Sequence, residues 1–305
     1  MKNIITKMSK NGLILYEKTN PYTLRMTKEE TCEALHREID FSKYDNICEI
    51  AHLEISNRCN MDCKYCYTGV KSKDELTLAQ WMEIIDKLAD YGIFQVSFGG
   101  GEPTMYPYMV ELGEYVRSKG LNLGMTTNGS KLHEMPLIWP KLKELFNQIN
   151  VSWHQNVDTV STALKVLKEL DIKAGINYCF SKDMAKDNHT VKSLARTWNA
   201  EVLYLAYKPV IGDYNNLIEP DVVYSAAKEA SDEGLKVAVD GPCAGECMMK
   251  KRFIDVDHLG NVFPCSFVRK SMGNLLENNL HDIWASRGEQ EECPYIEIPD
   301  KEKDG

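Results

Sequence analysis

The sequence predicts an α/β fold, a partial (β/α)6 barrel of the TIM type with a small cysteine-rich C-terminal module. From residue 51 to about residue 207, six short β-rich runs alternate with amphipathic stretches, as in repeated βα units around a parallel sheet. The 305 residues suffice for one large domain with a small addition. Cysteines become dense where the alternation ends. We therefore expect an N-terminal segment at 1–50, the barrel at 51–240 and the module at 241–305.

The elements of the barrel follow from local pattern. The expected strands are Ala51–Ser56, Ile93–Phe98, Leu121–Thr126, Ile149–Trp153, Ile172–Phe180 and Val202–Tyr207. A helix is expected from Leu78, because Thr77 and Gln80 have the spacing of a capping box, and Gly92 should end it. Later helices are expected at Tyr108–Ser118, Val157–Leu170, Val191–Trp198 and Asp221–Glu233.

Composition narrows the class of protein. With 43% hydrophobic and 27% charged residues, the chain fits a globular protein and not a disordered, collagenous or coiled-coil one. A net charge of −9 argues against general nucleic-acid or anionic-membrane binding. No apolar run has the length of a membrane span, and the N-terminus lacks a secretory signal, so we expect a cytoplasmic protein with no membrane partner. Ten cysteines there indicate metal ligands and not disulfides.

Three of these cysteines, Cys59, Cys63 and Cys66, follow the first expected strand, at the end of the sheet where barrel enzymes hold their chemistry. A closed zinc or four-iron site needs four protein ligands, and no fourth cysteine lies nearby in the sequence. An iron–sulfur cluster on these three residues would therefore keep one iron open to a substrate or cofactor. By spacing alone, a zinc site completed by a distant ligand such as His52 is the alternative.

The CxxxCxxC spacing resembles the radical S-adenosylmethionine (radical SAM) superfamily, and Tyr65 before the third cysteine matches it as well. The resemblance implies a [4Fe-4S] cluster whose open iron is chelated by S-adenosylmethionine, which the reduced cluster cleaves to a 5′-deoxyadenosyl radical. Four residues after the second strand resemble the motif that holds the cofactor's ammonium group. They are Gly99, Gly100, Gly101 and Glu102.

Two further residues resemble positions that contact the ribose and the carboxylate of S-adenosylmethionine, namely Asn128 and Ser152. A turn asparagine and a surface serine are the alternative interpretations. Many relatives follow that serine with Asp-Gly, whereas this chain has Trp153, His154 and Gln155, which leaves the substrate side open. Cys179 is either a buried apolar residue or a hydrogen-atom donor, and no catalytic residue is assigned.

The C-terminal cysteines resemble the opening of a SPASM domain or of the shorter twitch extension, which bind auxiliary iron–sulfur clusters. The resemblance rests on Cys247, Gly260, Cys265 and the stretch MGNLLENNLHDIW. Because only Cys293 follows, one auxiliary cluster is expected at most, on Cys247, Cys265, Cys293 and, if it is closed, Cys243. A structural zinc ribbon on the same cysteines is the alternative. Cys32 and Cys48 are assigned to packing.

The resemblance implies an enzyme that abstracts hydrogen from a substrate, and a peptide or protein modified by crosslinking, oxidation or epimerisation is the favoured one. It also implies a reducing partner such as flavodoxin or ferredoxin. A radical SAM dehydrogenase of a small molecule and a non-catalytic iron–sulfur or metal-binding protein are the alternatives. Residues 1–50 match nothing and are short for a winged-helix leader-peptide recognition domain, so a separate binding protein could serve instead.

Overall fold

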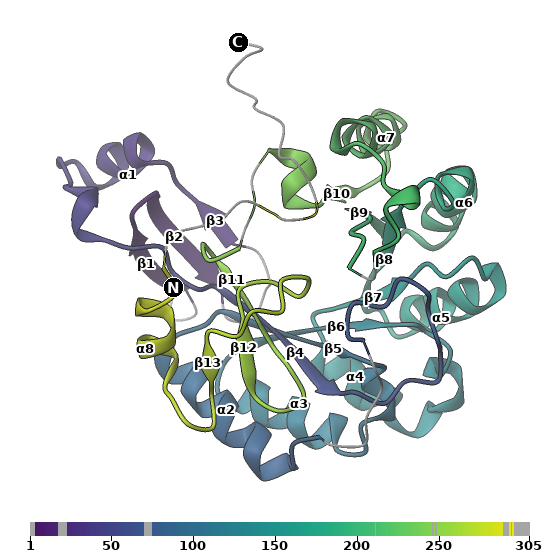
Figure 1. Ribbon diagram of the computed structural model, residues 1–305, viewed down its shortest axis with the longest axis horizontal. Coiled ribbons are helices and arrows are strands. Elements are labelled where there is room, and N and C mark those ends of the chain that lie inside the picture. The colour runs from purple at the N-terminus through teal and green to yellow at the C-terminus, as the bar shows by residue number, and fades with distance from the viewer. Residues whose placement is uncertain are drawn as a thin grey trace.

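The computed structural model describes residues 4–17, 23–69, 75–210, 212–245, 247, 249–288, 293 and 295. Its main feature is a sheet with the strand order β10-β9-β8-β7-β6-β5-β4-β11-β12-β13. Helices line the outside of this sheet, which curves as a partial barrel (Figure 1). The α/β barrel that the sequence predicts is therefore confirmed.

The six expected strands are all present, and each pairs in parallel with the next along the chain. Their bounds are β4 (Ile50–Ser56), β5 (Gln95–Gly100), β6 (Asn122–Thr127), β7 (Gln148–Ser152), β8 (Lys173–Phe180) and β9 (Glu201–Ala206). Two more parallel strands extend the sheet, β10 (Val237–Val239) beside β9 and β11 (Phe253–Val256) beside β4. Both are too short to show an alternating pattern in the sequence.

The helices pack apolar faces against the sheet. α2 (Leu78–Tyr91) begins with the expected capping box of Thr77 and Gln80, and Gly92 ends it with φ 88°. The other helices that flank the barrel are α3 (Met109–Ser118), α4 (Trp139–Leu145), α5 (Val157–Glu169), α6 (Asn188–Trp198) and α7 (Pro220–Asp232). α4 was not expected, because its seven residues are too few to show helical periodicity.

Short 3₁₀ helices complete the loops. They are η1 (Phe41–Lys43), η2 (Pro103–Met105), η3 (Leu132–Glu134), η4 (Pro136–Ile138), η5 (Ala185–Asp187), η6 (Tyr214–Asn216) and η7 (Gly241–Ala244). Two of them begin the connections that follow β5 and β10, so they shape the edge of the sheet at which these strands end.

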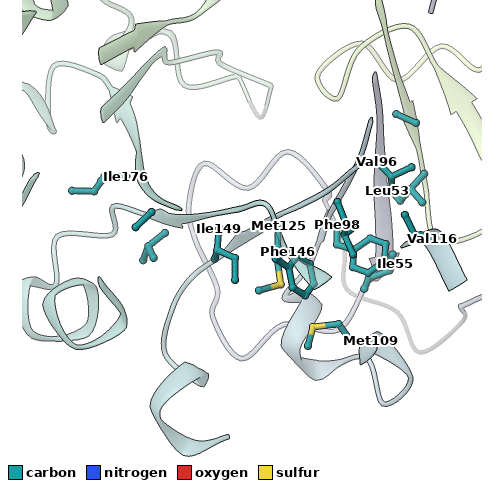
Figure 2. Packing of buried hydrophobic residues seen from close by; sticks show 14 of the residues in the cluster. Leu53, Ile55, Val96, Phe98, Met109, Val116, Met125, Phe146, Ile149 and Ile176 are labelled. Atoms are coloured by element: carbon teal, nitrogen blue, oxygen red, sulfur yellow. The ribbon is translucent and has the colours of Figure 1, made fainter. Parts of the chain in front are cut away.

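The core lies between the sheet and its helices. Figure 2 shows Leu53 and Ile55 of β4 beside Phe98 of β5, with Met125 of β6 and Phe146 further along the sheet. Because side chains alternate along a strand, the remaining positions point to the inner face of the barrel. Polar residues occupy that face. Among them, Asn150 donates to Asn177 at 2.8 Å and Gln148 donates to Asn150 at 2.9 Å.

The described residues before β4 form a unit that the sequence did not predict. β1 (Ile4–Ser9), β2 (Gly12–Glu17) and β3 (Thr23–Arg25) make an antiparallel sheet, and α1 (Lys28–Leu35) follows. Tyr16 attaches this sheet to the barrel, because its ring stacks on Phe94 at 4.6 Å and its hydroxyl donates to the Phe94 carbonyl. Phe94 directly precedes β5, so the attachment lies at the edge where the barrel strands begin.

The C-terminal segment continues the barrel sheet. β12 (Asn261–Phe263) pairs antiparallel with β11, and β13 (Gly273–Asn274) pairs with β12. α8 (Leu280–Ala285) ends the described helices, and its Trp284 donates to the Asn46 carbonyl at 2.8 Å. The division into three parts at residues 50 and 240 stays a prediction. In the described residues no helix is both long and apolar enough to cross a membrane.

Candidate functional site

The three clustered cysteines lie in a loop that follows β4. All three are partly buried. The loop turns around its own thiols, since Cys66 N donates to the Cys63 carbonyl at 3.1 Å and Met61 N donates to Cys59 Sγ at 3.4 Å. The loop therefore stands at the carboxyl edge of the parallel sheet, where the sequence analysis expects the chemistry.

The glycine run brings the end of β5 directly against this loop. Gly101 N donates to the Ser56 carbonyl at 2.7 Å, and Glu102 N donates to the Arg58 carbonyl at 2.8 Å. A Cβ on Gly101 would lie 2.2 Å from the Arg58 oxygen, and one on Gly100, whose φ is +106°, would lie 2.5 Å from the Ser56 oxygen. Glycine is therefore needed here for the close approach of two backbones.

The carboxylate of Glu102 joins the ends of β5 and β6. Glu102 is 1% exposed, and it accepts hydrogen bonds from the Thr127 hydroxyl and from Asn128 N, both at 2.7 Å. It also accepts from the Thr104 hydroxyl at 2.7 Å and from Thr104 N at 3.2 Å. This structural role was missed in the sequence, because Thr127 lies 25 positions away along the chain. Contact with a cofactor ammonium stays a prediction for Glu102.

The turn after β6 is fastened to the cysteine loop by amide side chains. Asn128 Nδ2 donates to Asn60 Oδ1 at 2.9 Å, and Asn60 Nδ2 donates to the Ser130 hydroxyl at 2.8 Å. The Ser130 hydroxyl donates in turn to Asn128 Oδ1 at 2.6 Å. The Asn-Gly turn thus positions the loop as well as reversing the chain.

A cavity of about 210 Å³ opens beside the cysteine loop. Its lining residues come from the loop, from the ends of β6 and β7 and from the start of α5. They are Met61, Asn128, Ser130, Ser152, His154, Asn156, Thr159 and Val160. Two residues that the sequence assigns to the cofactor, Asn128 and Ser152, therefore share one cavity with the loop.

His154 stands between this cavity and the cysteines. Its Nδ1 lies 2.6 Å from the Tyr65 hydroxyl and 3.7 Å from Cys63 Sγ, and the two rings stack at 5.9 Å. Burial lowers the pKa of His154 and raises the pKa of Tyr65, so a neutral imidazole accepts from a protonated phenol. Asp187 holds the neighbours of His154, accepting from Trp153 Nε1 at 3.1 Å and from Gln155 Nε2 at 2.9 Å.

The donor chemistry of the loop fits an iron–sulfur cluster, because such a cluster takes thiolates on separate irons. Among the residues that the structure describes, no three His, Cys, Asp or Glu side chains converge on one metal ion. His52, the alternative zinc ligand, is hydrogen-bonded to a residue outside the cysteine loop. Its Nδ1 lies 2.5 Å from Asp255 Oδ1, and its Nε2 would lie 2.0 Å from a Cβ on Gly99.

A buried charged network connects β4 with β11 behind the loop. Arg269 donates to both oxygens of Glu54, at 2.8 and 3.0 Å, and to Asp255 at 2.6 Å. Burial and the neighbouring Asp255 raise the pKa of Glu54 to about 9. Burial also acts to raise the pKa of Asp255, but His52 and Arg269 outweigh it and lower that pKa. The network thus holds the first barrel strand to the C-terminal segment.

Glu54→Gln is expected to change how stability depends on pH. Between pH values of about 4 and about 9 the unfolded chain loses the Glu54 proton before the folded chain does, so the wild-type free energy of unfolding falls as pH rises. Glutamine keeps the neutral shape and does not titrate. Urea denaturation at several pH values should therefore show the variant gaining stability relative to wild type as pH rises. A difference that stays constant with pH would contradict this.

The C-terminal cysteines divide into two groups. Burial raises the pKa of Cys247, and the nearby Cys293 thiol raises it further. Burial likewise raises the pKa of Cys265 to about 11, and Cys247 contributes to that shift. Cys243 is fully buried, and its thiol bonds to the backbone of Ala206. Cys247 thus lies near both Cys293 and Cys265, and ligation of a cluster by any of the four thiols stays a prediction.

The remaining cysteines belong to neither group, although Cys179 is near enough to Tyr65 and Lys208 to raise the pKa of both. Cys48 is fully buried, as expected of a packing residue, and Cys32 is partly buried on α1. Cys179 lies near the end of β8, and burial raises its pKa to about 11. An unactivated thiol of this kind fits either of the two interpretations that the sequence left open.

An aromatic contact links the cysteine loop to the C-terminal cysteines. Tyr67, next to Cys66, meets Phe267 edge-on with ring centroids 5.4 Å apart. Phe267 N in turn donates to Cys265 Sγ at 3.5 Å. Two aromatic side chains, Tyr67 and Phe267, thus connect the two cysteine groups, although these groups lie nearly 200 residues apart in the sequence.

Comparison with known proteins supports both cysteine groups. The model of the radical SAM superfamily matches residues 53–191, and that of SPASM, an iron–sulfur cluster-binding domain, matches residues 247–303. A PqqA peptide cyclase of Xanthomonas axonopodis pv. citri is 24% identical over 275 residues, covering 76% of this chain and 73% of the relative. An S-adenosylmethionine-dependent nucleotide dehydratase of Selenomonas ruminantium is 34% identical over 102 residues, covering 33% of this chain and 37% of the relative.

Among solved structures, SuiB of Streptococcus suis bound to S-adenosylmethionine is similar, with a TM-score of 0.75 and 16% identity over 93% of this chain and 87% of that one. That likeness shows the fold. The first three curated relatives are matched over only 37%, 48% and 30% of their own length. The two family models match in the order and at the positions that the cysteine motifs predict, and they imply the expected cofactors, [4Fe-4S] clusters and S-adenosylmethionine. The barrel therefore contains a radical SAM domain, and a SPASM domain follows it.

Proposed function

We propose that this protein binds a [4Fe-4S] cluster through Cys59, Cys63 and Cys66 and uses it with S-adenosylmethionine to modify a peptide or protein. The observation that carries the proposal is the cavity beside the cysteine loop, because it unites the loop with Asn128 and Ser152. When bound, the cluster supplies the electron that cleaves S-adenosylmethionine, and the resulting 5′-deoxyadenosyl radical takes a hydrogen atom from the substrate.

The chain's own residues hold and shield this chemistry. Gly100 and Gly101 keep the β5 backbone within hydrogen-bond distance of the loop, and Glu102 fixes the turn that carries Asn128. A cofactor in the cavity would meet the hydroxyl of Ser152 and the neutral ring of His154. The arrangement is rigid before any ligand enters, since strand ends and not long loops supply these groups.

Ser152→Ala is expected to weaken S-adenosylmethionine binding about twofold to tenfold, the effect of one lost hydrogen bond. Ser152 is partly buried at the end of β7, so the fold should tolerate the change. Isothermal titration of the anaerobically reconstituted protein would measure the dissociation constant. Ser118→Ala, on the exposed end of α3, is the matched control. Equal affinities of all three proteins would remove Ser152 from the cofactor site.

A peptide substrate is supported by the relatives that match most of this chain. The alignment with a PqqA peptide cyclase covers 76% of this chain. SuiB, which has a similar fold, was solved bound to the precursor peptide SuiA. The inner barrel face is also polar, since the amide side chains of Gln148, Asn150 and Asn177 bond to one another there, and such amides are able to bond peptide groups that replace these contacts. We also propose a cytoplasmic location, with reduced flavodoxin or ferredoxin as the electron donor.

The test is a dithionite-driven assay for 5′-deoxyadenosine under anaerobic conditions. Short peptides encoded beside the gene form one arm, and nucleotides and sugar alcohols form the other. We expect a peptide to increase 5′-deoxyadenosine formation and to lose hydrogen in its mass spectrum. Stimulation by a small molecule alone would establish the dehydrogenase alternative. Iron–sulfur clusters without any cofactor cleavage would establish the non-catalytic alternative.

The same proposal assigns an auxiliary cluster to Cys247, Cys265 and Cys293, with Cys243 as the candidate fourth ligand. The nearness of Cys247 to Cys293 and to Cys265 supports it. In an iron determination, a protein with both clusters should contain about eight irons per chain and a Cys265→Ala variant about four. Zinc in place of the second four irons would support the zinc-ribbon interpretation instead.

A further inference from the structure

Lys208 is a buried cation that the proposed reaction does not use. It lies just after β9, and its side chain is 4% exposed. Its ammonium pairs with the carboxylate of Asp240, which follows β10, and donates to the Ala206 carbonyl at 3.0 Å. A buried ammonium is costly unless it is paired and hydrogen-bonded, and here both conditions are met.

The ammonium also faces the C-terminal cysteines. It stands 4.5 Å from the ring centroid of Phe267, whose N–H donates to Cys265 Sγ at 3.5 Å. Burial acts to lower the pKa of Lys208, but Asp240, Cys265 and Cys179 outweigh it and raise that pKa. The ion pair with Asp240 and the bond to Ala206 keep the ammonium charged, and Phe267 connects it to the Cys265 sulfur.

We propose that Lys208 raises the reduction potential of the auxiliary cluster bound through Cys265. The inference rests on the cluster assignment of the proposed function. Reduction adds one negative charge to a cluster, and the potential of a cluster depends on the charges and hydrogen bonds around it. In a buried environment a fixed cation nearby stabilises the more negative state strongly. Lys208 would thus make the auxiliary cluster the better electron acceptor.

Lys208→Met tests the proposal in the reconstituted full-length protein. A redox titration followed by electron paramagnetic resonance measures both clusters in one sample. At a fixed solution potential, the ratio of reduced to oxidised auxiliary cluster should fall about tenfold, which is about 59 mV for one electron. The signal of the catalytic cluster should keep its potential. Lys208→Arg preserves the charge and should restore the wild-type value.

Two further variants separate charge from packing. Lys208→Met combined with Asp240→Asn removes both charges, so its potential should lie between those of the single variant and wild type. Lys192→Met removes another buried lysine, which is paired with Glu229 and Glu233 on the outside of the barrel, and should leave both potentials unchanged. Thermal melting of each variant reports folding independently of the clusters.

Each result decides between the possibilities. An unchanged auxiliary potential in a folded Lys208→Met protein that contains both clusters would overturn the role of Lys208 while leaving the proposed function intact. If the auxiliary cluster had the same reduction potential in the double variant as in Lys208→Met, lost packing and not lost charge would be the cause of the shift. Absence of the second four irons from the wild-type protein would overturn the auxiliary cluster itself, and the inference with it.

Discussion

Replacing Cys63 with alanine is expected to abolish 5′-deoxyadenosine formation and to reduce the iron content from about eight to about four per chain. The loop offers three thiols, all partly buried, and the structure places no other described cysteine in it. Cys63 Sγ also lies 3.7 Å from Nδ1 of His154, which lines the cavity, so this thiol is close to the cavity. With two thiolates left, one more iron of the cluster would lack a protein ligand.

Anaerobic reconstitution followed by iron and sulfide determination, beside the cleavage assay, measures this effect. Cys32→Ala is the matched control, because Cys32 lies on α1 outside the barrel and should keep all irons and full activity. Cys265→Ala should lose about four irons while keeping the catalytic cluster. Cleavage that persists in Cys63→Ala would show that this loop does not hold the catalytic cluster.

The sequence predicted the barrel well because its information is local. Each βα unit carries its own alternation, and the capping box of Thr77 and Gln80 marks a helix start within four residues. The cysteine loop and the glycine run are equally compact motifs. Since parallel strands share a carboxyl edge, knowing the strand order was enough to bring these motifs together.

Contacts between distant segments could not be predicted in this way. Glu102 meets Thr127, and Arg269 joins Glu54 with Asp255, through side chains that no spacing rule connects. β11 pairs with β4 across about 200 residues, although its sequence appeared to belong to the C-terminal module alone. β1 and β2 are as long as several barrel strands, but no alternation with helices marks them in the sequence, and β3 has only three residues.

The sequence indicated which polar residues lie at the site, but it did not indicate which residues they contact. Asn128 and Ser152 line one cavity, while their contact with a cofactor stays a prediction. His154 was assigned no role from the sequence, whereas the structure shows it bonded to Tyr65 and lining the same cavity, where it can reach a ligand. The reason is that side-chain direction at a strand end depends on the neighbouring strand, which the local sequence does not specify.

Gly101→Ala is expected to reduce cofactor cleavage about tenfold or more without removing any ligand or polar group. The added methyl would lie 2.2 Å from the Arg58 carbonyl oxygen, and its three nearest atoms all belong to the backbone of Asn57 and Arg58, which cannot rotate away as a side chain can. The loop must therefore move away from β5 and weaken the hydrogen bonds from Gly101 N and Glu102 N. Overpacking of this kind costs about 1–3 kcal/mol of stability. It also displaces the segment that carries the three cysteines.

Gly124→Ala is the matched control, on the neighbouring strand β6. A Cβ there would meet its nearest atoms at 3.6 Å, which is ordinary contact, and neither glycine has a positive φ. The control should retain its iron and its activity and should melt at or slightly above the wild-type temperature, since alanine lowers the entropy of the unfolded chain. Iron content, melting temperature and cleavage rate measured together separate the two variants. If Gly101→Ala behaved as Gly124→Ala does, the close approach of β5 to the cysteine loop would not be what holds that loop in its active geometry.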